Sequence, residues 1–120
     1  VDHNMKAERS ERGHFQSEGW RDAKNGGFFA YNMDTKGEEN LTLMVRYWGN
    51  ESGNRSFDIL IDGQVLVTEN IVGKWKREAF VNAEYQIPAE WLKGKEVINV
   101  RFQSKPGTVA GGVFYVRLIK

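Results

Sequence analysis

Apolar and polar side chains alternate along residues 41–63. Large apolar residues occupy every second position from Leu41 to Tyr47, a period of two that predicts a strand with one face in a core. A polar loop, Gly49–Asn54, follows this strand. The alternation resumes at positions 57, 59 and 61, and Asp62-Gly63 supplies the two residues that a tight hairpin needs before the next strand.

The same periodicity predicts strands in most of the remaining chain. They are expected at Phe28–Asp34, Val65–Thr68, Phe80–Ile87, Ile98–Phe102 and Val113–Ile119. A short edge strand is expected near Met5–Glu8, whereas Phe15–Gly27 contains three glycines and is interpreted as a loop. Pro88–Lys93, followed by Gly94, fits one short helical turn.

These segments amount to about seven or eight short strands, and no stretch shows the 3.6-residue period of a helix. The sequence therefore predicts an all-β protein, an antiparallel β-sandwich in which two sheets bury their apolar faces against each other. A small barrel is the alternative. With 120 residues and no internal repeat, the chain is expected to form a single domain, residues 1–120.

Composition excludes several classes of protein. Seventeen basic and sixteen acidic side chains balance to a net charge of +1, which argues against a nucleic-acid partner. No apolar run is long enough to span a membrane. The absence of cysteine excludes disulfides and a thiol nucleophile, and only His3 and His14 could serve a histidine-based site. Because the chain begins Val1-Asp2 without Met, we expect a processed chain or an excised segment.

The candidate chemistry lies in loops, where a sandwich usually carries its function. Trp20 and Trp48 could stack on the apolar face of a sugar ring. Arg21, Glu51 and Arg55 could then form paired hydrogen bonds with vicinal hydroxyls, and this combination suits carbohydrate.

A structural role is the alternative for the same residues. The two tryptophans could cap the ends of the core, while Arg21 and Arg55 pair with Asp22, Asp58 or loop carbonyls. Asp22 is also a candidate for hydrogen bonding to a sugar hydroxyl. The sequence alone leaves both interpretations open.

Nothing in the sequence marks a catalytic residue or a cofactor. A glycosidase needs two carboxylates facing each other across a groove, and no such pair stands out. Asp2, Glu8 and Glu11 could contribute to a structural calcium site, but no Asp-rich loop is present. No catalytic residue, metal site or cofactor is therefore predicted.

Four segments together carry a family resemblance: WRDA, YWG, FDILIDG and PGTVAGG. With their surroundings they resemble the small C-terminal domain of bacterial proteins of the DUF1680 type. Those proteins are beta-L-arabinofuranosidase-like glycoside hydrolases related to family 127. The resemblance spans nearly the whole chain and is weakest at Val65–Phe80.

The resemblance implies a jelly-roll or galactose-binding-like sandwich that follows an α/α-barrel catalytic domain. Catalysis in relatives of that barrel depends on cysteines, and this chain has none, so no residue inherits a catalytic role. The implied role is that of a non-catalytic accessory domain, which either binds plant-type glycan or braces the neighbouring catalytic domain of the same chain. The implied setting is extracytoplasmic, periplasmic or secreted, in Bacteroidetes.

Overall fold

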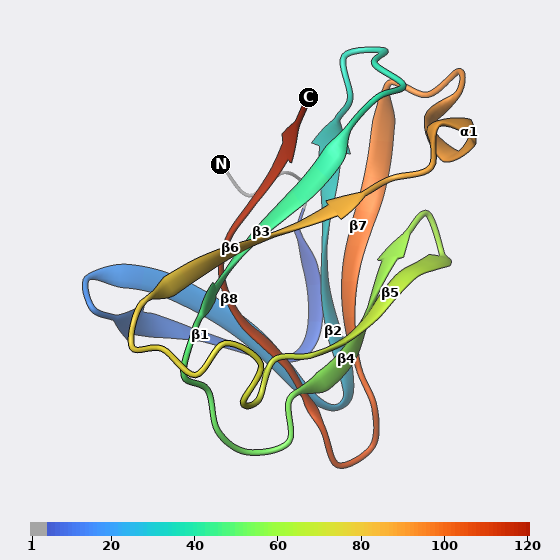
Figure 1. Ribbon diagram of the computed structural model, residues 1–120. Helices are drawn as coiled ribbons and strands as arrows, with labels where there is room; N and C mark the ends of the chain where they lie inside the picture. Colours follow the sequence, from blue (N-terminus) through green and yellow to red (C-terminus); the bar gives the residue numbers. More distant parts are fainter. Residues whose placement is uncertain (1–4) are drawn as a thin grey trace.

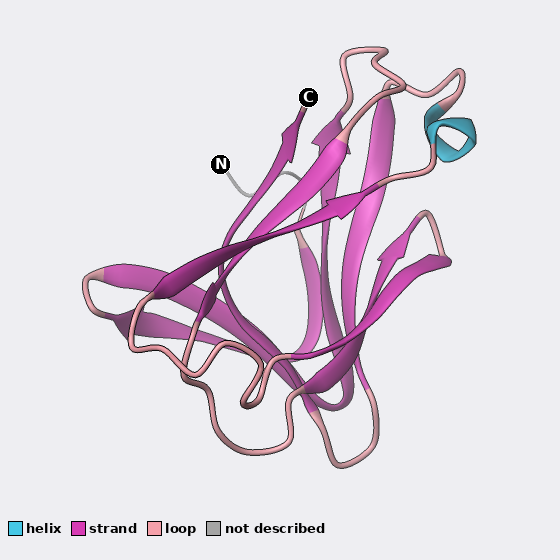
Figure 2. Cartoon of the chain, in the orientation of Figure 1, coloured by secondary structure: helices cyan, strands magenta, loops and turns pink. Residues whose placement is uncertain are grey.

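The computed structural model describes residues 5–120 and is built almost entirely of β-strands (Figures 1 and 2). Within these residues no helix is long and apolar enough to cross a membrane. The elements in chain order are β1 (Lys6–Phe15), β2 (Glu18–Asp34), β3 (Thr42–Trp48), β4 (Ser56–Ile61), β5 (Gln64–Asn70), β6 (Phe80–Gln86), α1 (Ala89–Leu92), β7 (Val97–Ser104) and β8 (Val109–Ile119).

All strand pairs named here are antiparallel and form one sheet that folds over on itself. The strand order is β5-β4-β7-β2-β8-β3-β6, and β1 pairs with β2 beside this path. Strands β5 and β6 are the two ends of this sheet. Because the sheet folds over on itself, its two layers face each other as in a sandwich (Figure 1). The predicted antiparallel β-sandwich is confirmed.

Strand β2 belongs to both layers because it bends in the middle. Arg21–Lys24 pairs with β8, and Phe28–Asp34 pairs with β7. Between these segments Asn25 and Gly26 have positive φ, a conformation that glycine adopts without strain. At Gly27 a Cβ would lie 2.3 Å from the Glu8 carbonyl oxygen, so only glycine allows β1 to approach this closely. The bend thus carries the chain from one layer to the other.

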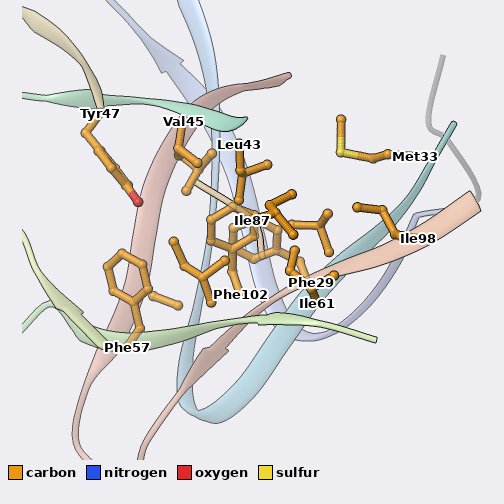
Figure 3. Packing of buried hydrophobic residues seen from close by; sticks show 14 of the residues in the cluster. Phe29, Met33, Leu43, Val45, Tyr47, Phe57, Ile61, Ile87, Ile98 and Phe102 are labelled. Carbon is orange, nitrogen blue, oxygen red and sulfur yellow. The ribbon is translucent and has the colours of Figure 1, made fainter. Parts of the chain in front are cut away.

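The core lies between the two layers and is made of the predicted alternating residues (Figure 3). Leu43, Val45 and Tyr47 of β3 are fully buried, and the side chains between them face outward. Across the core, Phe29 stacks on Phe102 with ring centroids 4.8 Å apart. Burying such side chains contributes about 1.5–3 kcal/mol each, which makes this interior the main source of stability.

A buried polar network closes the gap between the sheet ends. The Tyr85 hydroxyl donates to Glu69 at 2.7 Å and lies 3.0 Å from the Tyr47 hydroxyl. Lys74 contacts both oxygens of the buried Glu69 carboxylate, at 2.7 and 2.8 Å. Trp75 stacks on Tyr47, so this half-buried tryptophan packs against the core.

The sequence correctly placed the strands from Leu41 to Gln86 and the helical turn, observed as α1. The Asp62-Gly63 turn also forms, with positive φ at both residues. The loop predicted at Phe15–Gly27 is wrong, because only Gln16 and Ser17 form a turn and Glu18–Gly27 is the first part of β2. Its glycines serve the bend and the close strand contacts of β2 instead of marking a loop.

Candidate functional site

Two of the tryptophans line a single cavity of about 270 Å³, which we call the aromatic cavity. It lies where the β1–β2 hairpin, the loop after β3 and the start of β8 come together. Figure 1 shows that loop and the β7–β8 turn gathered at one end of the molecule, opposite α1. The lining residues are Phe15, Trp20, Asp22, Trp48, Asn50, Glu51, Arg55, Gly112 and Phe114.

Aromatic rings form one wall of the aromatic cavity. Trp48 is half-buried and meets Phe15 edge to face, with ring centroids 4.8 Å apart. On its other side Trp48 meets Phe80 at 5.3 Å. Trp20 lies across Gly13, where a Cβ would be 2.7 Å from the indole, so the glycine makes room for this ring. The rings are held by one another and leave a partly exposed apolar surface.

The loop after β3 supplies the polar wall. Gly49 begins the loop, and a Cβ there would be 2.6 Å from the Arg77 carbonyl oxygen. Arg55 ends it and donates to the carbonyl oxygens of Ser52 and Gly111, both at 2.8 Å. These contacts fix the guanidinium beside the cavity. The bond to Ser52 bears out the alternative that Arg55 binds a loop carbonyl, whereas Gly111 belongs to β8.

Glu51 and Arg55 form an ion pair within this wall, with Nε and Oε1 3.4 Å apart. Burial raises the pKa of Glu51, and the nearby Arg55 charge opposes the shift. The Gly112 N–H lowers the pKa of the same carboxylate and so also opposes the effect of burial. A Cβ at Gly112 would lie 3.6 Å from Trp20 Cβ and 3.9 Å from Glu51 Oε2, so this glycine keeps the floor of the cavity open.

The Asp22 carboxylate lines the aromatic cavity, and its hydrogen bonding is only partly satisfied. Its Oδ1 is buried and has no hydrogen-bond partner among residues 5–120. Burial raises the pKa of Asp22, and a hydrogen bond from the Glu11 N–H is the largest opposing contribution. A carboxylate oxygen buried without a donor costs stability, so Asp22 would gain from a hydroxyl donor brought by a ligand.

Four of the five predicted site residues therefore line one cavity: Trp20, Trp48, Glu51 and Arg55. Arg21 does not, because successive side chains of a strand point to opposite faces. Trp20 and Asp22 face the aromatic cavity, whereas Arg21 lies on the other face and donates to Ser10 Oγ at 2.9 Å. The expectation that Arg21 acts beside Trp20 rested on a loop at this position.

Sequence reasoning missed Phe15, Asn50, Gly112 and Phe114 as lining residues. Phe114 lies at a register shift in the pairing of β8 with β3. The alternation of a strand does not predict which face the side chain occupies at such a point. Phe15 was assigned to a loop. A signal for Phe15 was nevertheless present, since it is a large apolar residue at the end of a polar segment.

Residues 5–120 contain no group of three or more acidic or histidine side chains that could hold a metal ion. Of the suggested calcium ligands, Asp2 lies outside the described residues. Glu11 forms an exposed ion pair with Lys24. The described part of the chain offers no second ligand set in their place.

The sequence matches one family model over residues 1–119, that of a family of unknown function, DUF6805. The chain belongs to this family. No curated protein matches the sequence significantly.

Solved structures share the fold of this DUF6805 domain at low sequence identity. A family 35 carbohydrate binding module from Clostridium thermocellum has a TM-score of 0.69 and 13% identity, covering 99% of this chain and 94% of that chain. A family 6 module from Clostridium cellulolyticum in complex with xylose has a TM-score of 0.63 and 10% identity, covering 95% and 89%.

A third similar structure belongs to a longer enzyme. The exo-beta-1,3-galactanase of Phanerochaete chrysosporium, solved with beta-1,3-galactotriose, has a TM-score of 0.72 and 10% identity. The match covers 98% of this chain but 28% of that chain. At these identities the likeness establishes the fold, a jelly-roll sandwich of the kind found in carbohydrate-binding modules.

Proposed function

We propose that this protein is a non-catalytic carbohydrate-binding domain that takes a saccharide into the aromatic cavity. The observation that carries the proposal is the convergence of Trp20 and Trp48 with the Glu51–Arg55 pair around one cavity. Sugar rings have an apolar face of C–H groups and an edge of hydroxyls. An aromatic wall beside a charged polar wall offers both kinds of contact.

Each wall has a defined role in the proposal. Trp48 is held edge to face between two phenylalanines, so its position is fixed before a sugar arrives and little freedom is lost on binding. Arg55 is held by two carbonyl oxygens and would present remaining N–H groups to a hydroxyl. Glu51 and Asp22 would accept hydrogen bonds from other hydroxyls, and hydrogen bonds to charged groups are stronger than neutral ones.

The similar solved structures support this proposal. Two of them are carbohydrate-binding modules, and one of these contains xylose. Binding modules are not catalytic, which agrees with the expectation that this domain is no enzyme. Asp22 and Glu51 do share a cavity, and burial raises the pKa of both carboxyl groups.

We further propose that the domain is an accessory part of a longer, extracytoplasmic glycoside hydrolase of the DUF1680 type, with plant-type glycan as its ligand. The WRDA, YWG, FDILIDG and PGTVAGG segments support this finer assignment by resemblance. A purely structural domain that braces the catalytic barrel is the competing role. The two roles differ in a simple way, since only the first requires saccharide binding by the isolated domain.

Isothermal titration calorimetry against arabinose- and galactose-rich plant cell-wall oligosaccharides tests the proposal. We expect saturable binding that is lost in Trp48→Ala and Arg55→Ala. Trp91→Ala is the matched control, because Trp91 is also half-buried but lies outside the aromatic cavity. Absence of binding by the folded parent, or equal loss in the Trp91 variant, would favour the bracing role.

A further inference from the structure

The opposite face of the β1–β2 hairpin carries a second depression, of about 570 Å³, which we call the basic hollow. It lies on the side that Arg21 faces and shares Trp20 and Phe114 with the aromatic cavity as common walls. Its lining residues are Arg12, Gly13, His14, Gly19, Trp20, Arg21, Tyr31, Val113 and Phe114. No acidic side chain is among them.

Two arginines oppose each other directly across the hairpin. Arg12 and Arg21 are register partners in the antiparallel β1–β2 ladder, so their side chains lie on the same face. Like charges in this position repel and destabilise the pair of strands. His14 follows on the same face, opposite Gly19, which adds no side chain of its own. The arrangement therefore gathers three nitrogen-rich side chains around an unfilled space.

Acidic side chains near the hairpin are directed elsewhere. Glu11 pairs with Lys24, and Glu18 makes a bidentate ion pair with Arg46 at 2.9 and 3.0 Å. Asp22 faces the aromatic cavity. Among residues 5–120, the ion pairs of the structure include neither of the two opposed arginines.

Arg21 is also held in place. Its Nη1 donates to Ser10 Oγ at 2.9 Å, and that hydroxyl donates onward to the Asp22 carbonyl oxygen at 2.6 Å. Burial raises the pKa of the Tyr31 hydroxyl, and the same guanidinium opposes this shift. Fixed guanidinium and hydroxyl donors that face a space without a carboxylate match the several acceptor oxygens of an oxyanion.

We propose that the basic hollow binds an oxyanion, a carboxylate or sulfate group carried on a saccharide. The two depressions adjoin at Trp20 and Phe114, which line both of them. The inference rests on the proposed function for the neutral part of the ligand. The charge-binding step depends only on the basic hollow.

NMR titration of the whole chain with sodium sulfate, sodium glucuronate and neutral glucose tests the proposal. We expect sulfate or glucuronate to shift the backbone amides of Arg12, His14 and Arg21, and the anion that binds more tightly identifies the preferred group. Arg12→Gln should weaken this binding at least tenfold. Arg117→Gln removes an exposed arginine of β8 outside the hollow and should leave it unchanged.

Two results would overturn the oxyanion site: no shift of these amides with either anion, or an equal loss in Arg12→Gln and Arg117→Gln, which would indicate general charge attraction. Failure of the proposed function is a separate outcome. In that case neutral oligosaccharides would not bind, while sulfate would still shift the amides of the basic hollow.

Discussion

Replacing Asp22 with Asn should stabilise the fold and weaken saccharide binding. The carboxylate is partly buried, with Oδ1 lacking a hydrogen-bond partner within residues 5–120. An unsatisfied buried acceptor costs about 1–3 kcal/mol. Asparagine still places a polar atom at this position but removes the buried charge, and an unpaired charged group costs more than a neutral one. Because Asp22 is only half-buried, the gain is small, and the free energy of unfolding at pH 7 should rise by about 1 kcal/mol. For a domain of this size that corresponds to a rise in Tm of about 3–6 °C.

The pH dependence of the Asp22→Asn effect follows from the direction of the pKa shift. Burial raises the folded-state pKa of Asp22 above its ordinary value of 3.8. The folded parent therefore binds this proton more tightly than the unfolded chain, and its stability rises as the pH falls through the folded-state pKa. The asparagine variant lacks this gain. Its advantage over the parent should shrink from pH 7 toward pH 4.

Thermal unfolding of parent and variant at pH 7, 5.5 and 4 measures this difference, and calorimetry measures the loss of binding. Hydrogen bonds to charged acceptors exceed neutral ones by about 1–1.5 kcal/mol, so affinity should fall roughly tenfold. Asp58→Asn is the matched control, because Asp58 has the Thr68 hydroxyl and Lys105 as partners and should not gain stability. A less stable Asp22→Asn variant at pH 7, or an advantage independent of pH, would refute the reasoning.

Four further predictions follow from the structure. Tyr85→Phe removes a hydrogen-bond donor from the buried Glu69 carboxylate and should lower the free energy of unfolding in urea by about 1–3 kcal/mol. Because burial raises the pKa of Tyr85 in the folded state, the stability of the parent should also fall more steeply above pH 10 than that of the variant. Parallel pH profiles of the two proteins would contradict this. Gly111→Ala places a Cβ 2.9 Å from the Arg21 carbonyl oxygen at a φ of +104°. This variant should lower the free energy of unfolding by about 1–3 kcal/mol, measured by thermal unfolding. Gly112→Ala meets no contact under 3.6 Å and should fold normally but bind saccharide more weakly; unchanged affinity would speak against the cavity floor. Arg46→Met removes the ion pair with Glu18 that joins the hairpin to β3. The free energy of unfolding, measured by thermal unfolding, should fall by about 1 kcal/mol. An unchanged stability would mean that this ion pair does not stabilise the fold.

Period-two alternation was sufficient to predict most of the strands because their inner faces form the core. Leu43, Val45 and Tyr47 illustrate this, since each is fully buried as its position in the pattern requires. Alternation does not encode partners, so the order β5-β4-β7-β2-β8-β3-β6 could not be read from the sequence. The pairing depends on long-range contacts between strands far apart in the chain.

The candidate site was predicted in part for the same physical reason. Trp48 and Arg55 flank one polar loop, so their proximity followed from local spacing. The error at Arg21 arose because Gly26 and Gly27 suggested a loop, whereas they allow a strand to bend between layers. In a loop neighbouring side chains can converge, but in a strand Arg21 must point away from Trp20.

The indole N–H signals of the four tryptophans offer the most direct test of saccharide binding in the aromatic cavity. Trp20 and Trp48 line that cavity, whereas Trp75 stacks on Tyr47 and Trp91 lies in α1 and packs against the core outside the cavity. Titration with a binding oligosaccharide should therefore shift the first two signals and leave the other two in place. If no indole signal moves with any plant oligosaccharide, or if only those of Trp75 and Trp91 move, the aromatic cavity is not a carbohydrate site.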